Sequence, residues 1–231
     1  RDGVGNLLAE GVSKAAQKIG RGSERYAMHV KGLEVPLHEP RAKKGLGLSY
    51  ATSARGACHM QAFHDPDVER DDVAPEIGIS KALNRHDTSF GKVDMIKRSQ
   101  DWVAVTNCLL LCTSPAWVGF NYTRPVFLCD AVNATTGLHF TVDELMVIGE
   151  RANNLCRCFN AREGMTRKDD CLPPRFIKER LPDGPSKGQR ISQEELEEML
   201  DNYYGLRGWD KKTGNPTKEK LEELGLEFAV T

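Results

Sequence analysis

The stretch TVDELMVIGERANNLCRCFNAREG, residues 141–164, carries the clearest secondary-structure signal in the chain. Thr141 and Glu144 have the spacing of a capping box, in which each side chain bonds the other residue's backbone N–H at a helix start. Gly164 supplies a stop. Between these points apolar side chains recur at helical spacing: Leu145, Ile148, Ala152, Leu155 and Phe159. The stretch therefore predicts one long amphipathic helix.

Similar patterns on both sides of this stretch favour a mainly α fold. Apolar spacing predicts helices over residues 5–20 and 93–113. The second of these ends in the leucine run 109–111, which we expect to be buried. Ser192 and Glu195 form another capping box, and Thr217 and Gly225 have the chemistry of the two ends of a last helix. The helix after Ser192 carries an apolar face made of Leu196, Met199, Leu200 and Tyr203.

The chain between these helices is expected to be largely irregular. Residues 26–50 are rich in turn signals, residues 64–92 read as a polar surface excursion, and residues 165–190 are extended and proline-rich. A short helix over 55–63, capped by Thr52 or Ser53, and a connector over 114–140 complete the prediction. Strand alternation is brief, as at residues 28–35.

The composition is that of an ordinary globular chain. Its net charge is −1, with 32 basic and 33 acidic side chains, so no nucleic acid is expected as a partner. No apolar run approaches the roughly 20 residues of a membrane-spanning helix. The seven cysteines are odd in number and follow no secretory signal, so we expect reduced thiols and a cytoplasmic location. The chain lacks an initiating Met, so it is expected to begin within a domain.

Cysteine spacing leaves two readings open. Cys108 and Cys112 lie at i and i+4, which in a helix places both sulfurs on one face, whereas Cys156 and Cys158 would point in different directions. Neither pair has a second pair at metal-site spacing, so a self-contained zinc or iron–sulfur site is not expected. Spacing alone favours small buried side chains. The alternative is that Cys112 ligates a cluster whose other ligands lie outside this chain.

The six histidines form no metal-binding helical motif, and taken singly each is expected to be structural or superficial. His59 differs because it closes the segment SARGACH, residues 53–59. There Arg55 could fork onto a phosphate, and Gly56 would let a ligand approach the backbone. His59 could move a proton near neutral pH. By physics alone the segment is plausible as a site and is not a specific motif.

Several stretches resemble the aldehyde ferredoxin oxidoreductase family. YAMHVKGLEVP (26–36) is similar to its A-M-x-V-K-G-L-E-x-P stretch, and GLSYATSARGACH (47–59) to its L-x-Y-A-T-S-x-R-G-A-C-H segment. The similarity covers essentially the whole chain in order. Further matches are NAREG (160–164) with RKDD (167–170), and YYGLRGWD (203–210) with GNPT (214–217) and KLEELG (220–225).

The resemblance implies a domain assignment. Residues 36–231 correspond to the family's C-terminal helical domain, and residues 1–35 to the tail of its middle helical domain. The family's β-rich N-terminal domain has no counterpart in this chain. The same is true of the CxxCxxxC segment, which supplies three cluster cysteines in the family.

The resemblance also implies cofactors. The family holds tungsten, sometimes molybdenum, between two pyranopterins beside a [4Fe–4S] cluster, and it grips the pterins with two D-x-x-G-L-C/D motifs. The second motif aligns with NCLLLC, residues 107–112, which implies that Cys112 is the fourth cluster ligand. Asn107 takes the place of the pterin-contacting acid, and Leu111 that of the leucine. Asn107 replaces Asp with a neutral amide, and Leu110 replaces Gly.

Further site residues follow from the same alignment. Arg55 and Gly56 fall near the pterin, and Gln61 falls where some relatives have a basic residue. His59 falls beside the tungsten, where it can hydrogen-bond or protonate the substrate oxygen.

The implied function is a fragment of an oxidoreductase that converts aldehydes to carboxylates. Its electrons would pass through the cluster to ferredoxin or another redox partner. The fragment alone is expected to be inactive without the remaining N-terminal domains of the same protein. Two alternatives stay open: the tungsten subunit of a benzoyl-CoA-reductase-type enzyme acting on an acyl substrate, and a non-catalytic helical interaction module. A homo-oligomer is also possible.

Overall fold

The computed structural model describes residues 2–112 and 124–229, and within them the protein is mainly α-helical, as predicted. The strands in this part are β1 (His29–Val30) and β2 (Leu33–Glu34). They form an antiparallel hairpin that pairs His29 with Glu34. The α-helices are α1 (Gly3–Leu8), α2 (Gly11–Ile19), α3 (Lys44–Thr52), α4 (Phe90–Cys108), α6 (Pro125–Thr136), α7 (Val142–Arg162), α8 (Pro174–Lys178), α9 (Gln193–Arg207) and α10 (Lys218–Glu223).

The helix predicted from residues 141–164 is confirmed as α7. Both bonds of the capping box between Thr141 and Glu144 are present. α7 packs along α4 so closely that a β-carbon at Gly149 would collide with the carbonyl oxygen of Asp101. The predicted apolar face is buried only in part, because Leu145 is buried whereas Leu155 is 42% and Phe159 56% exposed.

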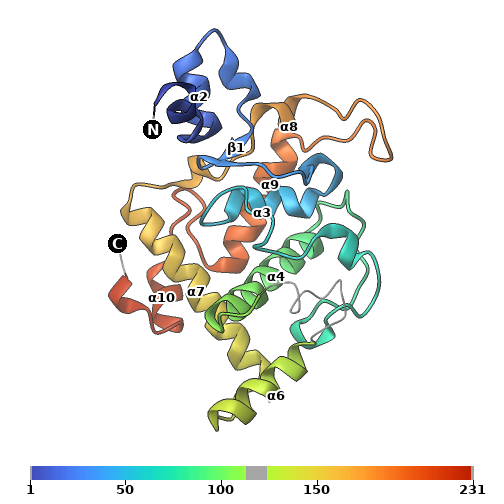
Figure 1. The fold of residues 1–231 in the computed structure, drawn as a ribbon. Helices are drawn as coiled ribbons and strands as arrows, with labels where there is room; N and C mark the ends of the chain where they lie inside the picture. The colour runs from blue at the N-terminus through green and yellow to red at the C-terminus, as the bar shows by residue number, and fades with distance from the viewer. Residues whose placement is uncertain (1, 113–123, 230–231) are drawn as a thin grey trace.

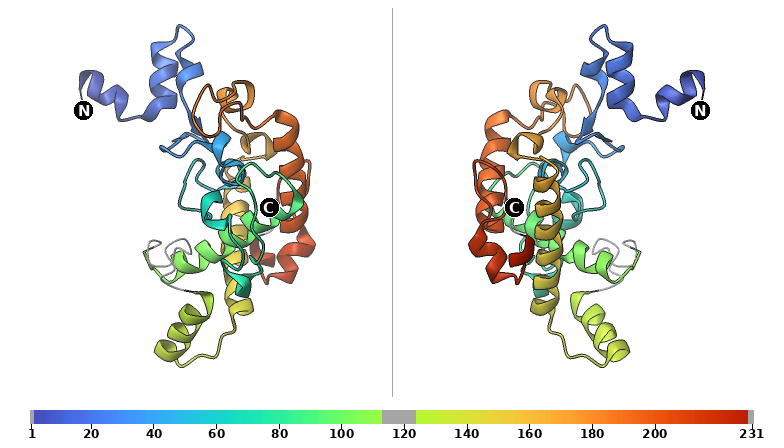
Figure 2. Two further views of the ribbon diagram at one scale, coloured as in Figure 1. Left: turned by 90° about the vertical axis from the view of Figure 1, so that its right-hand side faces the viewer. Right: turned by 90° about the vertical axis from the view of Figure 1, so that its left-hand side faces the viewer.

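The two predicted C-terminal helices are also confirmed. Ser192 and Glu195 cap α9, and the apolar face after them is buried. Thr217 caps α10, and Gly225 follows it with a left-handed φ of 64°. α4 crosses the middle of the molecule beside α7 and α9, with Trp102 fully buried in the shared core (Figure 1). Figure 2 shows α1 and α2 extending away from this core at one end and α6 at the other.

The prediction of irregular chain over residues 26–50 is wrong at α3. This helix has no side-chain cap of its own; instead the carboxylate of Asp65 accepts hydrogen bonds from the N–H groups of Gly45 and Leu46 at 3.1 and 2.9 Å. Every residue of α3 is buried. A β-carbon at Gly47 would collide with Ile191, so the small residue lets the helix pack tightly. The cap and the packing both come from distant parts of the chain.

Other boundaries differ from the prediction. The helix predicted over 5–20 is divided into α1 and α2. The helix predicted over 55–63 is wrong, because that segment consists of turns. The connector predicted over 114–140 contains α6, and residues 113–123 of the predicted segments lie outside the described residues. The excursion over 64–92 contains two short 3-10 helices, Asp65–Val68 and Pro75–Ile77, and α4 begins within it at Phe90. It is not superficial, since it buries Val68, Ala74, Ile77 and Ile79.

In the described part of the chain, no helix combines the length and the apolar character needed to cross a membrane.

Candidate cofactor site

A cavity of about 300 Å³ lies where the segment after α3 meets α4, α7 and the end of α9. Its wall is rich in side-chain amides, which can both donate and accept hydrogen bonds. Two arginines and one thiol also face it. The lining residues are Thr52, Ser53, Ala54, Arg55, Gln61, Gln100, Asn107, Asn153, Cys156, Arg157, Tyr203 and Trp209.

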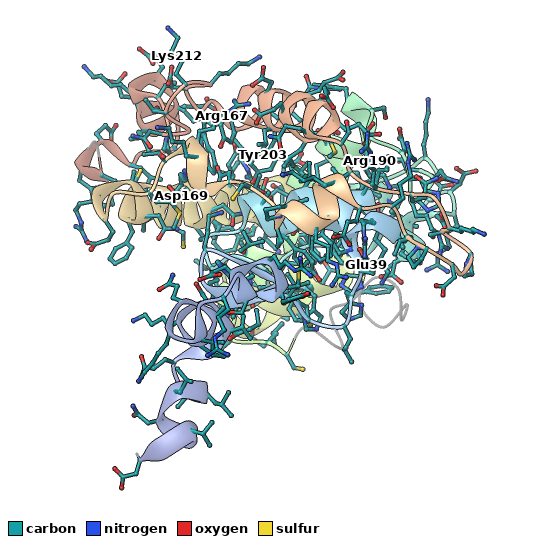
Figure 3. All side chains as sticks on the ribbon, turned by 90° about the horizontal axis from the view of Figure 1, so that it is seen from above. Glu39, Arg167, Asp169, Arg190, Tyr203 and Lys212 are labelled. Carbon is teal, nitrogen blue, oxygen red and sulfur yellow. The ribbon has the colours of Figure 1, made fainter. Side chains whose placement is uncertain are left out.

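Hydrogen bonds fix one side of this cavity. Gln100 of α4 donates to Thr52 Oγ1 at 3.2 Å, and its own oxygen accepts from Tyr203 Oη at 2.6 Å. Tyr203 lies inside the molecule in Figure 3, whereas Lys212 projects from its margin. Asn160 of α7 donates to the carbonyl of Ala54 at 2.9 Å. The segment after α3 is therefore tied to α7, and the cavity wall is fixed before any ligand arrives.

Arg157 is the most informative residue of the wall. It is buried, and its Nη1 bonds the buried Asp170 at 3.0 Å while its Nε donates to the carbonyl of Gly214 at 2.8 Å. Its guanidinium stacks over Trp209. Its Nη2, also buried, has no hydrogen-bond partner among the described residues. A buried donor without a partner costs about 1–3 kcal/mol, so a ligand that accepts from this nitrogen would remove that cost.

Three of the predicted cofactor-binding residues come together on this cavity. Arg55 and Gln61 reach it from the segment after α3, and Asn107 reaches it from the last turn of α4. Arg55 and Gln61 also share a neighbour, because Arg55 Nη2 donates to Cys58 Sγ at 2.8 Å and Gln61 Nε2 lies 4.0 Å from the same sulfur.

Gly56 packs against the protein's own backbone. Its φ is +92°, and a β-carbon there would collide with the carbonyl oxygen of Val30 in β1. The glycine thus lets the cavity segment lie directly against the β-hairpin. The placement of Gly56 near a pterin, which the family resemblance implies, stays a prediction.

Gly56→Ala is expected to lower the free energy of unfolding by about 3–5 kcal/mol, because left-handed strain and a backbone collision add. Urea unfolding of the purified protein measures this. Gly184→Ala is the matched control, since Gly184 has φ +76° with no other atom within 4 Å of a β-carbon. Its free energy of unfolding should fall only by the cost of the left-handed strain, about 1–2 kcal/mol. Equal losses in the two variants would show that the approach of β1 is unimportant.

The end of α4 departs from the prediction. The helix ends at Cys108, so Cys108 and Cys112 do not share a helical face. The leucine run is not buried: Leu110 is 92% and Leu111 43% exposed, and Cys112 is exposed as well. These residues leave the helix because Leu110 adopts a left-handed φ of 56°. The prediction for the other pair is confirmed, since Cys158 is buried and Cys156 exposed.

Leu110→Gly is expected to raise the free energy of unfolding by about 0.5–1 kcal/mol, since the left-handed penalty for leucine exceeds the entropy cost of glycine. The exposed side chain contributes little packing. Leu138→Gly, at another exposed leucine without a positive φ, is the control and should be neutral or destabilising. A loss of stability in Leu110→Gly would contradict the strained conformation.

His59 lies on the same segment but not on the cavity wall. Its ring stacks on that of His38, with centroids 4.8 Å apart. Partial burial, and then the positive charge of Lys43, hold the pKa of His59 below its usual value. Among the described residues, no three histidine, cysteine or acidic side chains gather closely enough to hold a metal ion.

The sequence reasoning missed several wall residues. Asn153, Cys156, Arg157 and Asn160 recur at i, i+3, i+4 and i+7, a polar stripe at helical spacing. This stripe is visible in the sequence. Its first three residues line the cavity, and Asn160 bonds the segment after α3. Gln100 carried no comparable signal, because its role depends on Thr52 and Tyr203, which are distant in the chain.

The protein is thus a mainly helical domain with a cavity lined by side-chain amides, and one nitrogen of the buried Arg157 on its wall has no hydrogen-bond partner among the described residues. The family model for aldehyde ferredoxin oxidoreductase, domains 2 and 3, matches residues 1–226. The chain therefore belongs to the aldehyde ferredoxin oxidoreductase family.

Known relatives share the similarity over nearly the whole chain. The tungsten-containing aldehyde ferredoxin oxidoreductase of Pyrococcus horikoshii is 41% identical over 98% of this chain and 35% of its own length. A WOR-like subunit of an aliphatic sulfonate oxidoreductase from Pyrococcus furiosus is 30% identical over 98% of this chain and 33% of its own. This chain thus spans about a third of the length of these relatives.

A solved structure has the same fold. It is the active-site complex BamBC of benzoyl coenzyme A reductase with 1,5-dienoyl-CoA, which matches 99% of this chain and 37% of its own with a TM-score of 0.70 and 26% identity.

Proposed function

We propose that this chain is part of an oxidoreductase that converts aldehydes to carboxylates with a tungsten, or molybdenum, bis-pyranopterin and a [4Fe–4S] cluster. The observation that carries the proposal is the cavity on which Arg55, Gln61 and Asn107 meet. These residues come from two separate family motifs, and their convergence supports a shared ligand.

The cavity residues fit a pterin. Such a ring system carries donors and acceptors side by side along its edge, and amides such as Asn107 and Gln61 offer both kinds of group. The unpartnered Nη2 of Arg157 adds a buried charged donor for a carbonyl or phosphate oxygen. When bound, the metal cofactor would supply two-electron chemistry and the cluster one-electron transfer.

This chain's own residues would have separate roles. Asn107, Arg55 and Gln61 would hold the pterin, with Gly56 and Leu111 beside them. Cys112 would ligate the cluster as its fourth cysteine. His59 would accept or return a proton at the substrate oxygen. Oxidation of an aldehyde with one water gives a carboxylate, two electrons and three protons, so the site needs a base.

The proposal includes partners. The remaining domains of the same protein would supply the other cluster cysteines and the second pterin contacts. Ferredoxin or a similar carrier would receive the electrons. We also propose a cytoplasmic location, because free thiols such as those of this chain persist in a reducing compartment.

Activity of the full-length protein under anaerobic conditions tests the substrate class. We expect reduction of a viologen dye with aldehydes and none with the matching alcohols. A second candidate is a reductase of aromatic acyl-CoA thioesters, favoured by the likeness to the benzoyl coenzyme A reductase complex. Turnover of dienoyl-CoA, and not of aldehydes, would select that reaction. Metal-loaded protein without either activity would refute both.

A further inference from the structure

His38, His59, His64 and Lys43 form a compact cluster. The ring of His38 stacks on His59 at 28° and meets His64 edge-on, with centroids 4.6 Å apart. His59 and His64 have centroids 6.0 Å apart. Lys43 Nζ lies 3.3 Å from His38 Nδ1 and 3.4 Å from His64 Nδ1.

The contacts define which ring nitrogens carry hydrogens. A lysine ammonium has only donors, so both nitrogens that face Lys43 must accept. His64 then carries its hydrogen on Nε2, which lies 2.9 Å from the carbonyl oxygen of His59 and donates to it. His38 is neutral for the same reason, and burial, followed by the neighbouring His64, Lys43 and His59, lowers its pKa to about 4. The Lys43 ammonium thus keeps His38 and His64 neutral, and the rings of both lie close to His59.

We propose that Lys43, His38 and His64 are positioning residues that hold His59 as a neutral imidazole, ready to accept a proton from the substrate water. In this step a water O–H bond breaks and an N–H bond forms at the unprotonated ring nitrogen of His59, while the electron pair stays on the water oxygen, which bonds the aldehyde carbon. The inference rests on the proposed function for the identity of the proton donor. The control of the charge on His59 is a property of this chain alone.

Other charges around the cluster support an ammonium at position 43. Burial lowers the pKa of Lys43, and Asp65 and Asp67 oppose that effect, while Arg85 adds to it. Asp67 also faces His64. On the segment of His59 itself the charged side chain is Arg55, which donates to the sulfur of Cys58. Asp65 itself is paired with Lys92. Of these cations, Lys43 is the one whose charge lowers the pKa of His59, and it contacts His38, whose ring stacks on His59.

The test compares three variants of the full-length protein. Lys43→Gln removes the charge but keeps a donor, Lys43→Arg keeps the charge, and Lys187→Gln removes an exposed lysine elsewhere. The first measurement is deuterium exchange at the imidazole C2 of His59 against pH, read by tandem mass spectrometry. The second is kcat/KM against pH with an aldehyde.

In Lys43→Gln, the pKa of His59 should rise by about 0.5–1 unit. Because a base must be unprotonated to act, the acidic limb of the kcat/KM profile should move to higher pH by the same amount. Lys43→Arg and Lys187→Gln should match the unchanged protein in both measurements.

Two results would overturn the inference: an unchanged pKa of His59 in Lys43→Gln, or an equal shift in Lys43→Arg, which would assign the effect to packing. The proposed function fails separately. If no aldehyde is turned over, the exchange measurement still decides whether Lys43 controls the charge on His59.

Discussion

Cys112→Ala in the full-length, anaerobically purified protein is expected to abolish the EPR signal of a reduced [4Fe–4S] cluster. The proposed cluster needs four thiolates, and the family resemblance implies that Cys112 is one of them. In this chain the thiol is exposed beyond the end of α4. It is therefore accessible to a cluster that the other three cysteines of the full-length protein would hold.

Cys108→Ala is the matched control for this variant. Cys108 is also exposed and is the last residue of α4, but the alignment gives it no ligand role. We expect its cluster signal and iron content to be unchanged. A full signal in Cys112→Ala, or equal losses in the two variants, would refute the ligand assignment.

Asp65→Asn is expected to lower the free energy of unfolding by about 3–5 kcal/mol, the range for breaking a buried ion pair by removing one partner. Asp65 and Lys92 are both fully buried, and their charged atoms are 2.7 Å apart. The same carboxylate caps α3 through Gly45 and Leu46. Its loss leaves Lys92 as an unpaired charge and weakens the helix that leads into the cavity segment.

A double variant separates the two contributions. Asp65→Asn with Lys92→Met removes the unpaired charge, so it should recover a large part of the lost stability. Asp183→Asn, at an exposed carboxylate, should change the unfolding free energy by less than about 0.5 kcal/mol. Urea unfolding of the unchanged protein, Asp65→Asn, Lys92→Met and the double variant measures the cycle, with Asp183→Asn alongside as the control. A double variant as unstable as Asp65→Asn would show that the cap, and not the buried charge, dominates.

Local chemistry explains which elements could be predicted from the sequence. α7, α9 and α10 carry their own N-terminal caps and apolar faces, so their signals lie within a few residues. α3 has two glycines, no capping side chain and no polar face. It is stable because Asp65 caps it and the core surrounds it, and neither contribution is readable from residues 44–52.

At the end of α4 a local sequence pattern predicts a helix that the structure does not contain. Three consecutive leucines predict a buried helix, yet Leu110 leaves the helix in a left-handed conformation. A left-handed φ favours glycine, the residue that the family resemblance implies at this position.

The candidate site could be predicted in part. The motifs led to Arg55, Gln61 and Asn107, and the structure places all three on one cavity. Arg157, His38 and Lys43 were missed because their importance depends on contacts. Arg157 has a buried nitrogen without a partner among the described residues, and the ammonium of Lys43 contacts both His38 and His64. Such relations appear only once distant segments are packed together.

Metal analysis of the full-length protein, purified anaerobically, tests the central claim most directly. The account predicts about one tungsten or molybdenum atom and about four iron atoms per chain, with an EPR signal from the reduced cluster. Protein that is folded but contains no tungsten, molybdenum or iron would contradict it, and would favour a non-catalytic helical module instead.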